Sequence, residues 1–345
     1  MGRAGGGGGK SPTDQANMAT QRTTMAAALA ARRRWDSLPA RFTKARAHLF
    51  VLHGTHEHSG RPCYEDLAFA CNSSGLIVSS FDFQGHGTRG GDGCRGDFGS
   101  LDNAIAESIE LIKSERKASA TTEVPFIVFG HSLGSLVAFL LSHELATAAL
   151  PGPSLVILSG FAMDSVSPPF GVKALTPVLR AAPSVIHKIT EVLSGLNPHG
   201  PACPLPPPTE LTHDEERAAH SLRDPLMHHG WIQNRTALAL LEGRARCARL
   251  LPDWGRSFPF LLIHGGEDSL CPKSACEALL RHSPQPDKTL RLYDGCFHEV
   301  LNERQPERDA AIRDIQLWIE QRLDQMQQAA SIGVAEGAST LRSRL

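Results

Sequence analysis

The chain has 345 residues, of which 41% are hydrophobic and 21% charged, and its net charge is −1. This length suffices for one sizeable core with an insertion. The charge is uneven: residues 1–48 carry nine Lys or Arg against two acids, so the remainder is acidic, which argues against a body that binds nucleic acid. No run of 18 apolar residues could span a membrane, and no secretory signal is recognisable, so we expect a soluble protein that is not secreted.

Residues 1–46 are rich in Gly and then in Ala, Arg and Thr, and we expect a disordered basic segment here. Because this segment is rich in Arg and poor in acids, an organellar transit peptide is the alternative. The eight cysteines are scattered without a CxxC pair, which predicts free thiols in a reducing compartment.

Strand and helix patterns alternate from residue 47 onward. We expect strands at 47–53, 76–82, 124–129 and 154–159, and helices at 62–72, 101–118 and 133–147. The alternation resumes near 258 and ends in a helix over 307–328. This order predicts an α/β fold with a mainly parallel, doubly wound sheet, built from residues 47–160 and 251–328 and followed by a flexible tail over 329–345.

The most specific stretch joins the strand at 124–129 to the helix at 133–147. It reads GHSLG, a Gly-x-Ser-x-Gly motif, and predicts a nucleophile elbow in which Ser132 stands on a sharp turn between strand and helix. A structural Gly/Ser turn is the alternative. The backbone N–H groups of Leu133, at the start of the helix, and of Thr55, after the first strand, are then the expected donors of an oxyanion hole.

The insertion between the two parts of the sheet, residues 161–250, is expected to form a helical cap. Its first half carries apolar residues at helical spacing, and a Pro-rich linker follows over 198–208. Thr212 and Glu215 form a capping-box pattern, which predicts the start of another helix. The apolar stripe either packs on the core or acts as a lid that shelters an acyl chain and makes transient contact with a membrane.

A serine nucleophile needs a base and an acid that orients the base, and in this class of fold they follow in the order Ser, acid, His. A buried strand that begins near residue 258 ends in a loop with Asp268, and His298 follows the next strand. Both lie at the carboxyl ends of parallel strands, so we predict Asp268 as the orienting acid and His298 as the general base. Glu267 is the rival acid; the alternatives are a helix N-cap for Asp268 and a surface position for His298.

Four stretches together resemble the monoacylglycerol lipase branch of the α/β-hydrolases, which is grouped with the serine aminopeptidase hydrolases. They are HGTHEHSGR at 53–61, DFQGHG at 82–87, GHSLG at 130–134 and YDGCFH at 293–298. The first is the most specific, and the resemblance covers about residues 45–325. It implies an α/β-hydrolase fold with a cap, Ser132, Asp268 and His298 as the triad, and Thr55 and Leu133 as oxyanion donors.

The resemblance also implies that Glu57 and Arg61 contact the glycerol head of a substrate, where a carboxylate accepts from hydroxyl groups and a guanidinium donates to them. An ion pair within the loop is the alternative for both. The chain departs from the family pattern at Ser135, where many members have glycine, and at Leu301, where some have a histidine that contacts glycerol. Cys271 resembles a cysteine that confers sensitivity to thiol reagents, with a buried inert thiol as the alternative.

We therefore expect a serine hydrolase that cleaves carboxylic esters of lipids, with monoacylglycerol split into fatty acid and glycerol through an acyl-enzyme. A lysophospholipase or a small-molecule carboxylesterase with the same triad is the alternative, for which Lys173, Arg180 and Lys188 could supply a basic rim. A catalytically inactive binding protein is a third hypothesis. No cofactor is expected, and no metal, since the paired histidines lack metal-ligand spacing.

The chain ends in Ser343-Arg344-Leu345, which resembles the Ser-Lys-Leu peroxisomal address. On a flexible tail, this tripeptide would be accessible to the peroxisomal import receptor. We therefore expect either a peroxisomal or a cytoplasmic location.

Overall fold

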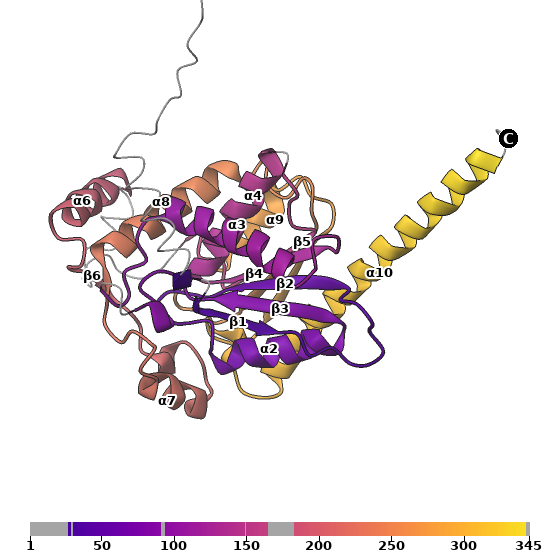
Figure 1. Cartoon of the computed structure of the whole chain (residues 1–345). Coiled ribbons are helices and arrows are strands. Elements are labelled where there is room, and N and C mark those ends of the chain that lie inside the picture. Colours follow the sequence, from indigo (N-terminus) through magenta and orange to yellow (C-terminus); the bar gives the residue numbers. More distant parts are fainter. Residues whose placement is uncertain (1–26, 29, 91–93, 149, 165–182, 343–345) are drawn as a thin grey trace, which may run out of the picture.

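One seven-stranded sheet forms the centre of the molecule (Figure 1). The computed structural model describes residues 27–28, 30–90, 94–148, 150–164 and 183–342, with side chains as far as 332. The strand order is β1-β3-β2-β4-β5-β8-β9, and all neighbours are parallel except β1, which pairs antiparallel with β3. The predicted mainly parallel, doubly wound sheet is therefore confirmed.

The strands begin and end close to where the sequence predicts them. They are β1 (Arg32–Trp35), β2 (Ala47–Leu52), β3 (Leu76–Phe81), β4 (Phe126–His131), β5 (Leu155–Ser159), β8 (Phe260–Gly265) and β9 (Lys288–Tyr293). Every residue of β2, β3, β4, β5 and β8 is buried, as expected for parallel strands covered by helices on both faces.

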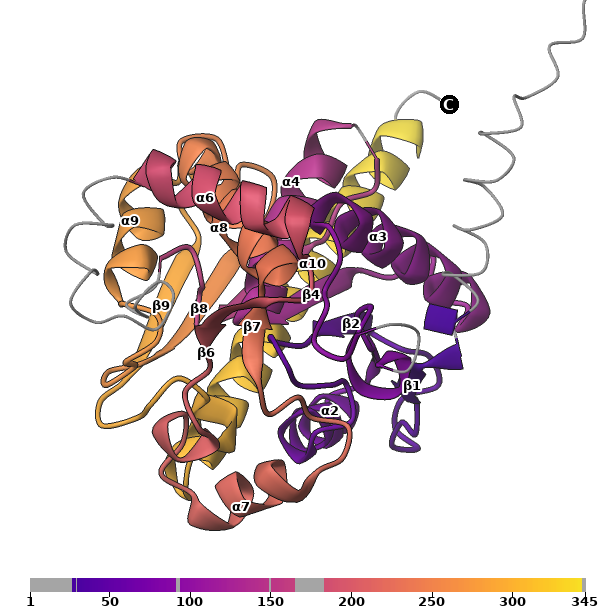
Figure 2. The ribbon, with the colours of Figure 1, turned by 90° about the vertical axis from the view of Figure 1, so that its left-hand side faces the viewer.

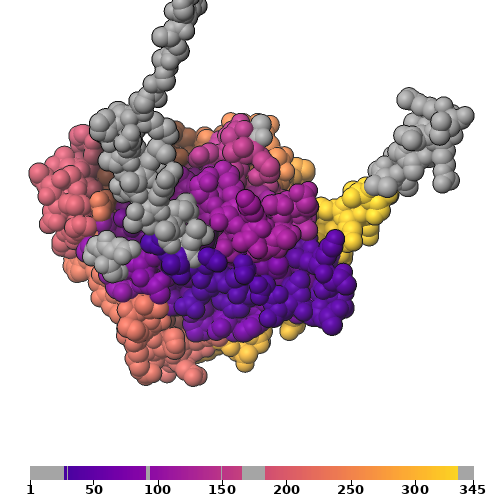
Figure 3. Space-filling model, in the orientation of Figure 1, coloured from indigo at the N-terminus to yellow at the C-terminus, as the bar shows by residue number. Residues whose placement is uncertain are grey.

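Two groups of helices cover the two faces. One face packs against α3 (Leu101–Ala118), α4 (Leu133–Thr147) and α9 (Ser274–His282), and the other against α2 (Pro62–Ser73) and α10 (Glu307–Arg342). Each face has its own apolar core, and the aliphatic and Trp side chains that α10 presents at helical spacing are buried in the second one. Figure 3 shows α10 projecting beyond the body of the molecule.

Two terminal predictions are wrong in the part of the chain that is described. Residues 32–35 lie within the segment expected to be disordered, yet they form the edge strand β1. Its Arg32 and Arg34 lie 2.9 and 3.6 Å from the carboxylate of the buried Glu115, so the basic residues that suggested disorder compensate a buried charge. At the other end, α10 continues to Arg342, past the expected end at 328, because the sequence there is rich in helix-forming residues and contains no proline. The terminal tripeptide lies outside the described residues.

Between β5 and β8 the chain forms the cap (Figure 2). Its elements are α6 (Pro183–Leu196), β6 (Pro201–Pro204), η4 (Pro208–Glu210), α7 (Glu215–Arg223), β7 (Trp231–Gln233) and α8 (Asn234–Leu250). Helices α6 and α8 pack on each other. Strand β6, which lies in the segment expected to be a Pro-rich linker, pairs antiparallel with β7. The remaining apolar part of the insertion, 165–182, lies outside the described residues.

The predicted capping box at the start of α7 is wrong. The N-cap residue is Asp214, whose carboxylate accepts from the amide of Arg217 at 3.0 Å. Thr212 instead donates its hydroxyl to the carbonyl of Asn302 at 2.8 Å and so fastens the cap to the core. Across the described ranges, no helix is both long and apolar enough to cross a bilayer.

Candidate active site

Ser132 stands on the turn between β4 and α4. Its backbone has φ +51° and ψ −118°, a left-handed conformation that is costly for a residue other than glycine and typical of a nucleophile elbow. The amide of Ser132 donates to the carbonyl of Ser159 at 2.9 Å, which ties the turn to the end of β5. The strained turn holds the serine at the carboxyl edge of the sheet, directly before the N-terminus of α4.

Close packing explains why Gly130 and Gly134 of the motif are glycines. A Cβ atom at Gly130 would lie 2.3 Å from the carbonyl oxygen of Gly134, and one at Gly134 would lie 2.2 Å from that of Leu52. Both distances are below any real contact, so the helix can approach β2 and β4 this closely only with glycine at the two positions.

His298 and Asp268 form a hydrogen-bonded pair beside this turn. Nδ1 of His298 lies 2.7 Å from Oδ2 of Asp268, while the other carboxylate oxygen accepts from the amides of Leu270 and Cys271 at 2.9 and 2.8 Å. Nε2 of His298 is buried and has no hydrogen-bond partner among the described residues. The ring is thus oriented through one nitrogen and leaves the other available. The rival acid Glu267 is exposed, whereas Asp268 contacts the histidine.

Each member of this pair changes the acidity of the other. Burial alone would lower the pKa of His298, but the negative charge and hydrogen bond of Asp268 outweigh it and raise that pKa above its ordinary value. Burial alone would raise the pKa of Asp268, but the charge and hydrogen bond of His298 bring it below its ordinary value. The arrangement therefore favours an ionised aspartate and stabilises a protonated imidazole.

Thr55 and Leu133 lie where the sequence places an oxyanion hole. Leu133 supplies the first amide of α4, and Thr55 follows β2 in a loop that touches the nucleophile turn, since a Cβ at Gly54 would lie 3.1 Å from Cβ of Ser132. The amides at the first turn of a helix have no partner within the helix, and the helix dipole favours negative charge there. Leu133 directly follows Ser132, and Thr55 lines the same cavity as Ser132, so their role as oxyanion donors stays a prediction.

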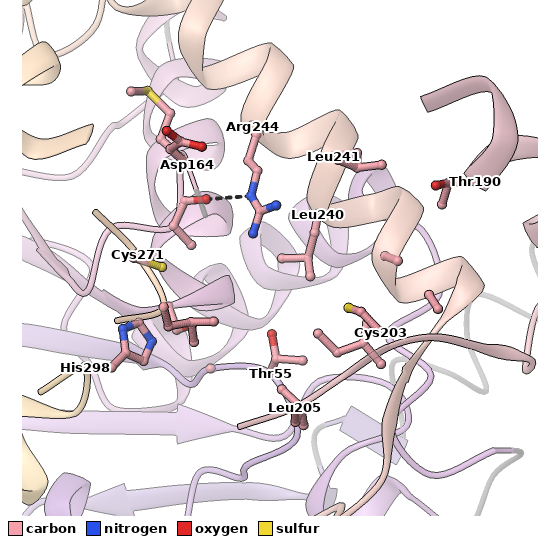
Figure 4. Close-up of a pocket in the computed structure, with 18 of the residues that line it drawn as sticks. Thr55, Asp164, Thr190, Cys203, Leu205, Leu240, Leu241, Arg244, Cys271 and His298 are labelled. Carbon is pink, nitrogen blue, oxygen red and sulfur yellow. Dashed lines mark hydrogen bonds between the residues drawn. The ribbon is translucent and has the colours of Figure 1, made fainter. Parts of the chain in front are cut away.

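Ser132 and His298 both line a cavity of about 740 Å³. Figure 4 shows His298 at this cavity together with residues of the core and of the cap. The core lines one side, including Thr55, and the cap lines the other with apolar side chains of α6 and α8 such as Ile186 and Leu240. A cavity of this size and lining can hold a ligand with a long apolar part.

Glu57 and Arg61 form the ion pair that was the alternative to substrate binding. Arg61 donates to Glu57 and, through both terminal nitrogens, to the carboxylate of Glu299 at 2.8 Å each. Tyr64 and the amide of Gly54 also donate to Glu57. Burial would raise the pKa of Glu57, but Arg61 holds it well below the ordinary range. Of the predicted pair, Glu57 lines the cavity and Arg61 does not.

Cys271 lines the cavity but is only 2% exposed. Burial and the neighbouring Asp268 raise the pKa of its thiol well above the ordinary value, which favours the inert-thiol alternative. Ligand atoms of Asp268, Cys271 and His298 lie within 4.8 Å of one another, the only such group in the described ranges. Because Asp268 and His298 already share a hydrogen bond, their pairing accounts for this grouping.

Among the cavity residues that the sequence analysis did not predict are Glu299 and Arg244. Glu299 follows His298 directly and carried no signal of its own, and Arg244 interrupts an apolar stripe on α8, but the sequence does not show which face of that helix meets the cavity. Of the residues expected to form a basic rim, Lys188 is exposed and pairs with Glu191 at 2.9 Å. The other two, Lys173 and Arg180, lie outside the described residues.

A serine on a strained strand-to-helix turn, next to a histidine held by an aspartate at the edge of a mainly parallel sheet, defines an α/β-hydrolase of the serine hydrolase class. The chain belongs to the serine aminopeptidase (S33) hydrolase family, whose model matches residues 43–305. The family match and the similarity to known lipases identify it as a serine hydrolase of the lipase and esterase group.

Among curated relatives, the chain is similar to the monoacylglycerol lipase of Mycolicibacterium smegmatis, with 29% identity over 80% of this chain and 89% of that protein. It is also similar to the monoglyceride lipase of Rattus norvegicus, with 27% identity over 81% and 84%. Among solved structures, the monoacylglycerol lipase of Paleococcus ferrophilus superposes with a TM-score of 0.65 at 22% identity, over 84% of this chain and 98% of that one. That likeness shows the fold.

Proposed function

We propose that Ser132, His298 and Asp268 act as a catalytic triad that hydrolyses carboxylic esters of lipids, with monoacylglycerol as the substrate. The observation that supports this most directly is the position of His298, which is hydrogen-bonded to Asp268 through Nδ1. Its Nε2 has no partner among the described residues, and it shares a cavity with Ser132. That is the arrangement that a general base for a serine requires.

In the proposed reaction, Oγ of Ser132 attacks the ester carbonyl carbon while Nε2 of His298 takes its proton. The amides of Thr55 and Leu133 hold the oxyanion of the tetrahedral intermediate. Its collapse breaks the bond to the alcohol oxygen, which leaves with the proton from His298, and an acyl-enzyme remains. His298 then takes a proton from water, the hydroxide attacks the acyl carbon, and the fatty acid departs as Ser132 regains its proton.

The lipid substrate is supported by the cavity and by the relatives. Side chains of α6 and α8 give the cavity an apolar wall next to the triad. The curated relatives named above are a monoacylglycerol lipase and a monoglyceride lipase. For this chain we propose the same substrate class, with the cap as the lid of an acyl-binding cavity. Glu57 and Glu299 would accept hydrogen bonds from the alcohol part, and Arg61 would hold the two carboxylates in place.

The test is release of fatty acid from 1- and 2-oleoylglycerol, next to oleoyl lysophosphatidylcholine and 4-nitrophenyl butyrate. Ser132→Ala should lower every Ser132-dependent rate at least about 1,000-fold, because the nucleophile is lost. Ser142→Ala is the matched control, since its hydroxyl is buried in α4 without a partner in the described chain, and it should change rates less than about twofold.

The outcomes separate the hypotheses. Release from oleoylglycerol that disappears in Ser132→Ala supports the proposal. Cleavage of only the lysophospholipid or the short ester keeps the triad and transfers the assignment to the alternative substrate classes. No Ser132-dependent cleavage of any ester would overturn the catalytic assignment.

A further inference from the structure

The side of α8 that faces the cavity carries one charged residue in an apolar stripe. Residues at helical spacing on this side are Ala237, Leu240, Leu241, Arg244 and Ala245, and all five line the cavity. Four of them suit an acyl chain, and Arg244 does not. Figure 4 shows its guanidinium among Cys271, Asp164 and Leu240, on the side of the cavity opposite Thr55.

Among the described residues, only one of the donor groups of Arg244 has a partner. Its Nε donates to the carbonyl of Ala162 at 3.0 Å, and no hydrogen bond or ion pair reaches its two terminal nitrogens from the described residues. Asp164 acts on Arg244 through its charge, but the two do not form an ion pair within 4.0 Å. Burial lowers the pKa of Arg244, as expected for a cation without a close counter-ion.

Arg244 is partly buried, and two fully buried arginines show how a guanidinium removed from water is paired in this molecule. Arg61 holds the carboxylate of Glu299 with two hydrogen bonds of 2.8 Å, and Arg89 holds that of Glu107 with two of 2.9 Å. A buried charge costs free energy unless it is paired, and the planar guanidinium pairs best with the two oxygens of a carboxylate or phosphate. Arg244 has the donors for such a pair, but no carboxylate of the described chain accepts hydrogen bonds from its terminal nitrogens.

The position of Arg244 places an anion close to the reacting groups. Arg244 and Cys271 both line the cavity and lie near each other in Figure 4, and Cys271 lies with Asp268 and His298 in a group whose polar atoms are within 4.8 Å of one another. An anion on the terminal nitrogens of Arg244 would therefore share the cavity with an ester at Ser132.

We propose that Arg244 binds a carboxylate or phosphate group carried by the ester substrate, so that this hydrolase accepts anionic esters. This inference rests on the proposed ester hydrolysis and adds esters that carry an anionic group to the proposed substrates. The anionic group can belong to the acyl part or to the alcohol part, and two pairs of substrates distinguish these sources.

The experiment compares kcat/KM within each pair at about pH 7. The acyl pair is 4-nitrophenyl hydrogen suberate against 4-nitrophenyl octanoate, and the alcohol pair is oleoylglycerol 3-phosphate against 1-oleoylglycerol.

The measured quantity is the kcat/KM of the anionic substrate divided by that of the neutral one. In Arg244→Gln this ratio should fall about tenfold or more in one pair, because hydrogen bonds to a charged group are lost. Arg244→Lys, which keeps the charge but loses the planar fork, should retain part of the ratio. Arg249→Gln, an exposed arginine on the same helix, should leave it within about twofold.

If the ratio falls in Arg244→Gln for the acyl pair, the anionic group belongs to the acyl part of the substrate. If it falls for the alcohol pair, the anionic group belongs to the alcohol part. If both ratios stay unchanged while neutral esters are still cleaved in a Ser132-dependent way, the anion subsite is overturned and the proposed function stands. If the wild type cleaves no ester, the proposed function fails, and calorimetry with suberate then decides on the subsite. Binding at least tenfold weaker in Arg244→Gln than in the wild type supports it, and equal binding overturns it.

Discussion

The hydrogen bond between His298 and Asp268 determines how the proposed activity responds to pH. His298 must be neutral to take the proton of Ser132, and Asp268 raises the pKa of His298 above its ordinary value of 6.5. We therefore expect kcat/KM for a short nitrophenyl ester to be low in acid and to rise with pH through an apparent pKa above 6.5. Asp268→Asn removes the charge that favours imidazolium, so the rise should move to lower pH while the rate falls about 1,000- to 10,000-fold.

The control for this profile is Glu267→Gln, which changes the exposed neighbour and should leave both the rate and the apparent pKa unaltered. A profile that is the same in Asp268→Asn and the wild type would contradict the assignment of Asp268. An effect of Glu267→Gln as large as that of Asp268→Asn would transfer the role to the rival acid.

Single residues differ in how far the sequence could predict them. The proposed triad follows from local signals, namely a motif between a strand and a helix and two side chains at strand ends in a fixed order. Arg61 carried the same kind of signal, but its contact with Glu299 joins positions 238 residues apart, so its burial behind two carboxylates could not be foreseen. Arg244 was missed because the role of an isolated arginine depends on which face of the helix meets the cavity.

Helix α6 has two different faces. Ile186 and Thr190 are buried toward the cavity, whereas Val185, Val192 and Leu196 on the outer side are 49%, 49% and 80% exposed. An exposed apolar face on the lid suits contact with a lipid surface, since burying one such side chain contributes about 1.5–3 kcal/mol. The inner side of this helix thus packs toward the cavity, and contact of the outer side with a membrane stays a prediction.

This gives a prediction for the element. Replacing both Val192 and Leu196 by Asp should weaken sedimentation with phosphatidylcholine vesicles and lower hydrolysis of oleoylglycerol in those vesicles about tenfold or more, because the apolar face is lost. Hydrolysis of a soluble short ester should change less than about twofold. Leu317→Asp, on the exposed side of α10 at 46% exposure, is the control and should behave as the wild type. Vesicle binding that is unchanged in the double variant would contradict a membrane role for α6.

Elements with an apolar period were predictable, and those without one were not. The helices and parallel strands of the core show such a period, and their limits fall within a few residues of the expected ones. Strand β1 reads Arg-Arg-Arg-Trp and has no apolar alternation, because Arg32 and Arg34 meet the carboxylate of Glu115 and only Trp35 packs against the core. Strand β6 is rich in proline and pairs only with the three-residue β7, so its sequence resembled a linker.

At the scale of the whole molecule, the fold keeps several histidines neutral. Burial lowers the pKa of seven of the histidines in the described chain, to about 3 for His48 and His86 and to about 4 for His131; the other four are His53, His56, His228 and His264. Asp268 shifts the pKa of His298 in the opposite direction. The seven outnumber it, so protonation in acid favours the unfolded chain, in which each imidazole titrates near 6.5.

We therefore expect the free energy of unfolding to be greatest above about pH 6.5 and to fall as the pH drops toward the lowered pKa values. Between those limits the unfolded chain binds more protons than the folded one, and each such histidine lowers stability by up to about 1.4 kcal/mol per pH unit. Urea unfolding between pH 7.5 and 5 measures this slope.

His48→Gln should reduce the slope of the free energy of unfolding against pH by the contribution of one histidine. The variant also loses the contacts with Thr121 and Ser79, which lowers the free energy of unfolding equally at every pH and leaves the slope unaffected. His282→Gln, at an exposed position, should leave the slope unchanged. A slope that His48→Gln and His282→Gln alter equally would show that burial of His48 does not set the acid sensitivity of the fold.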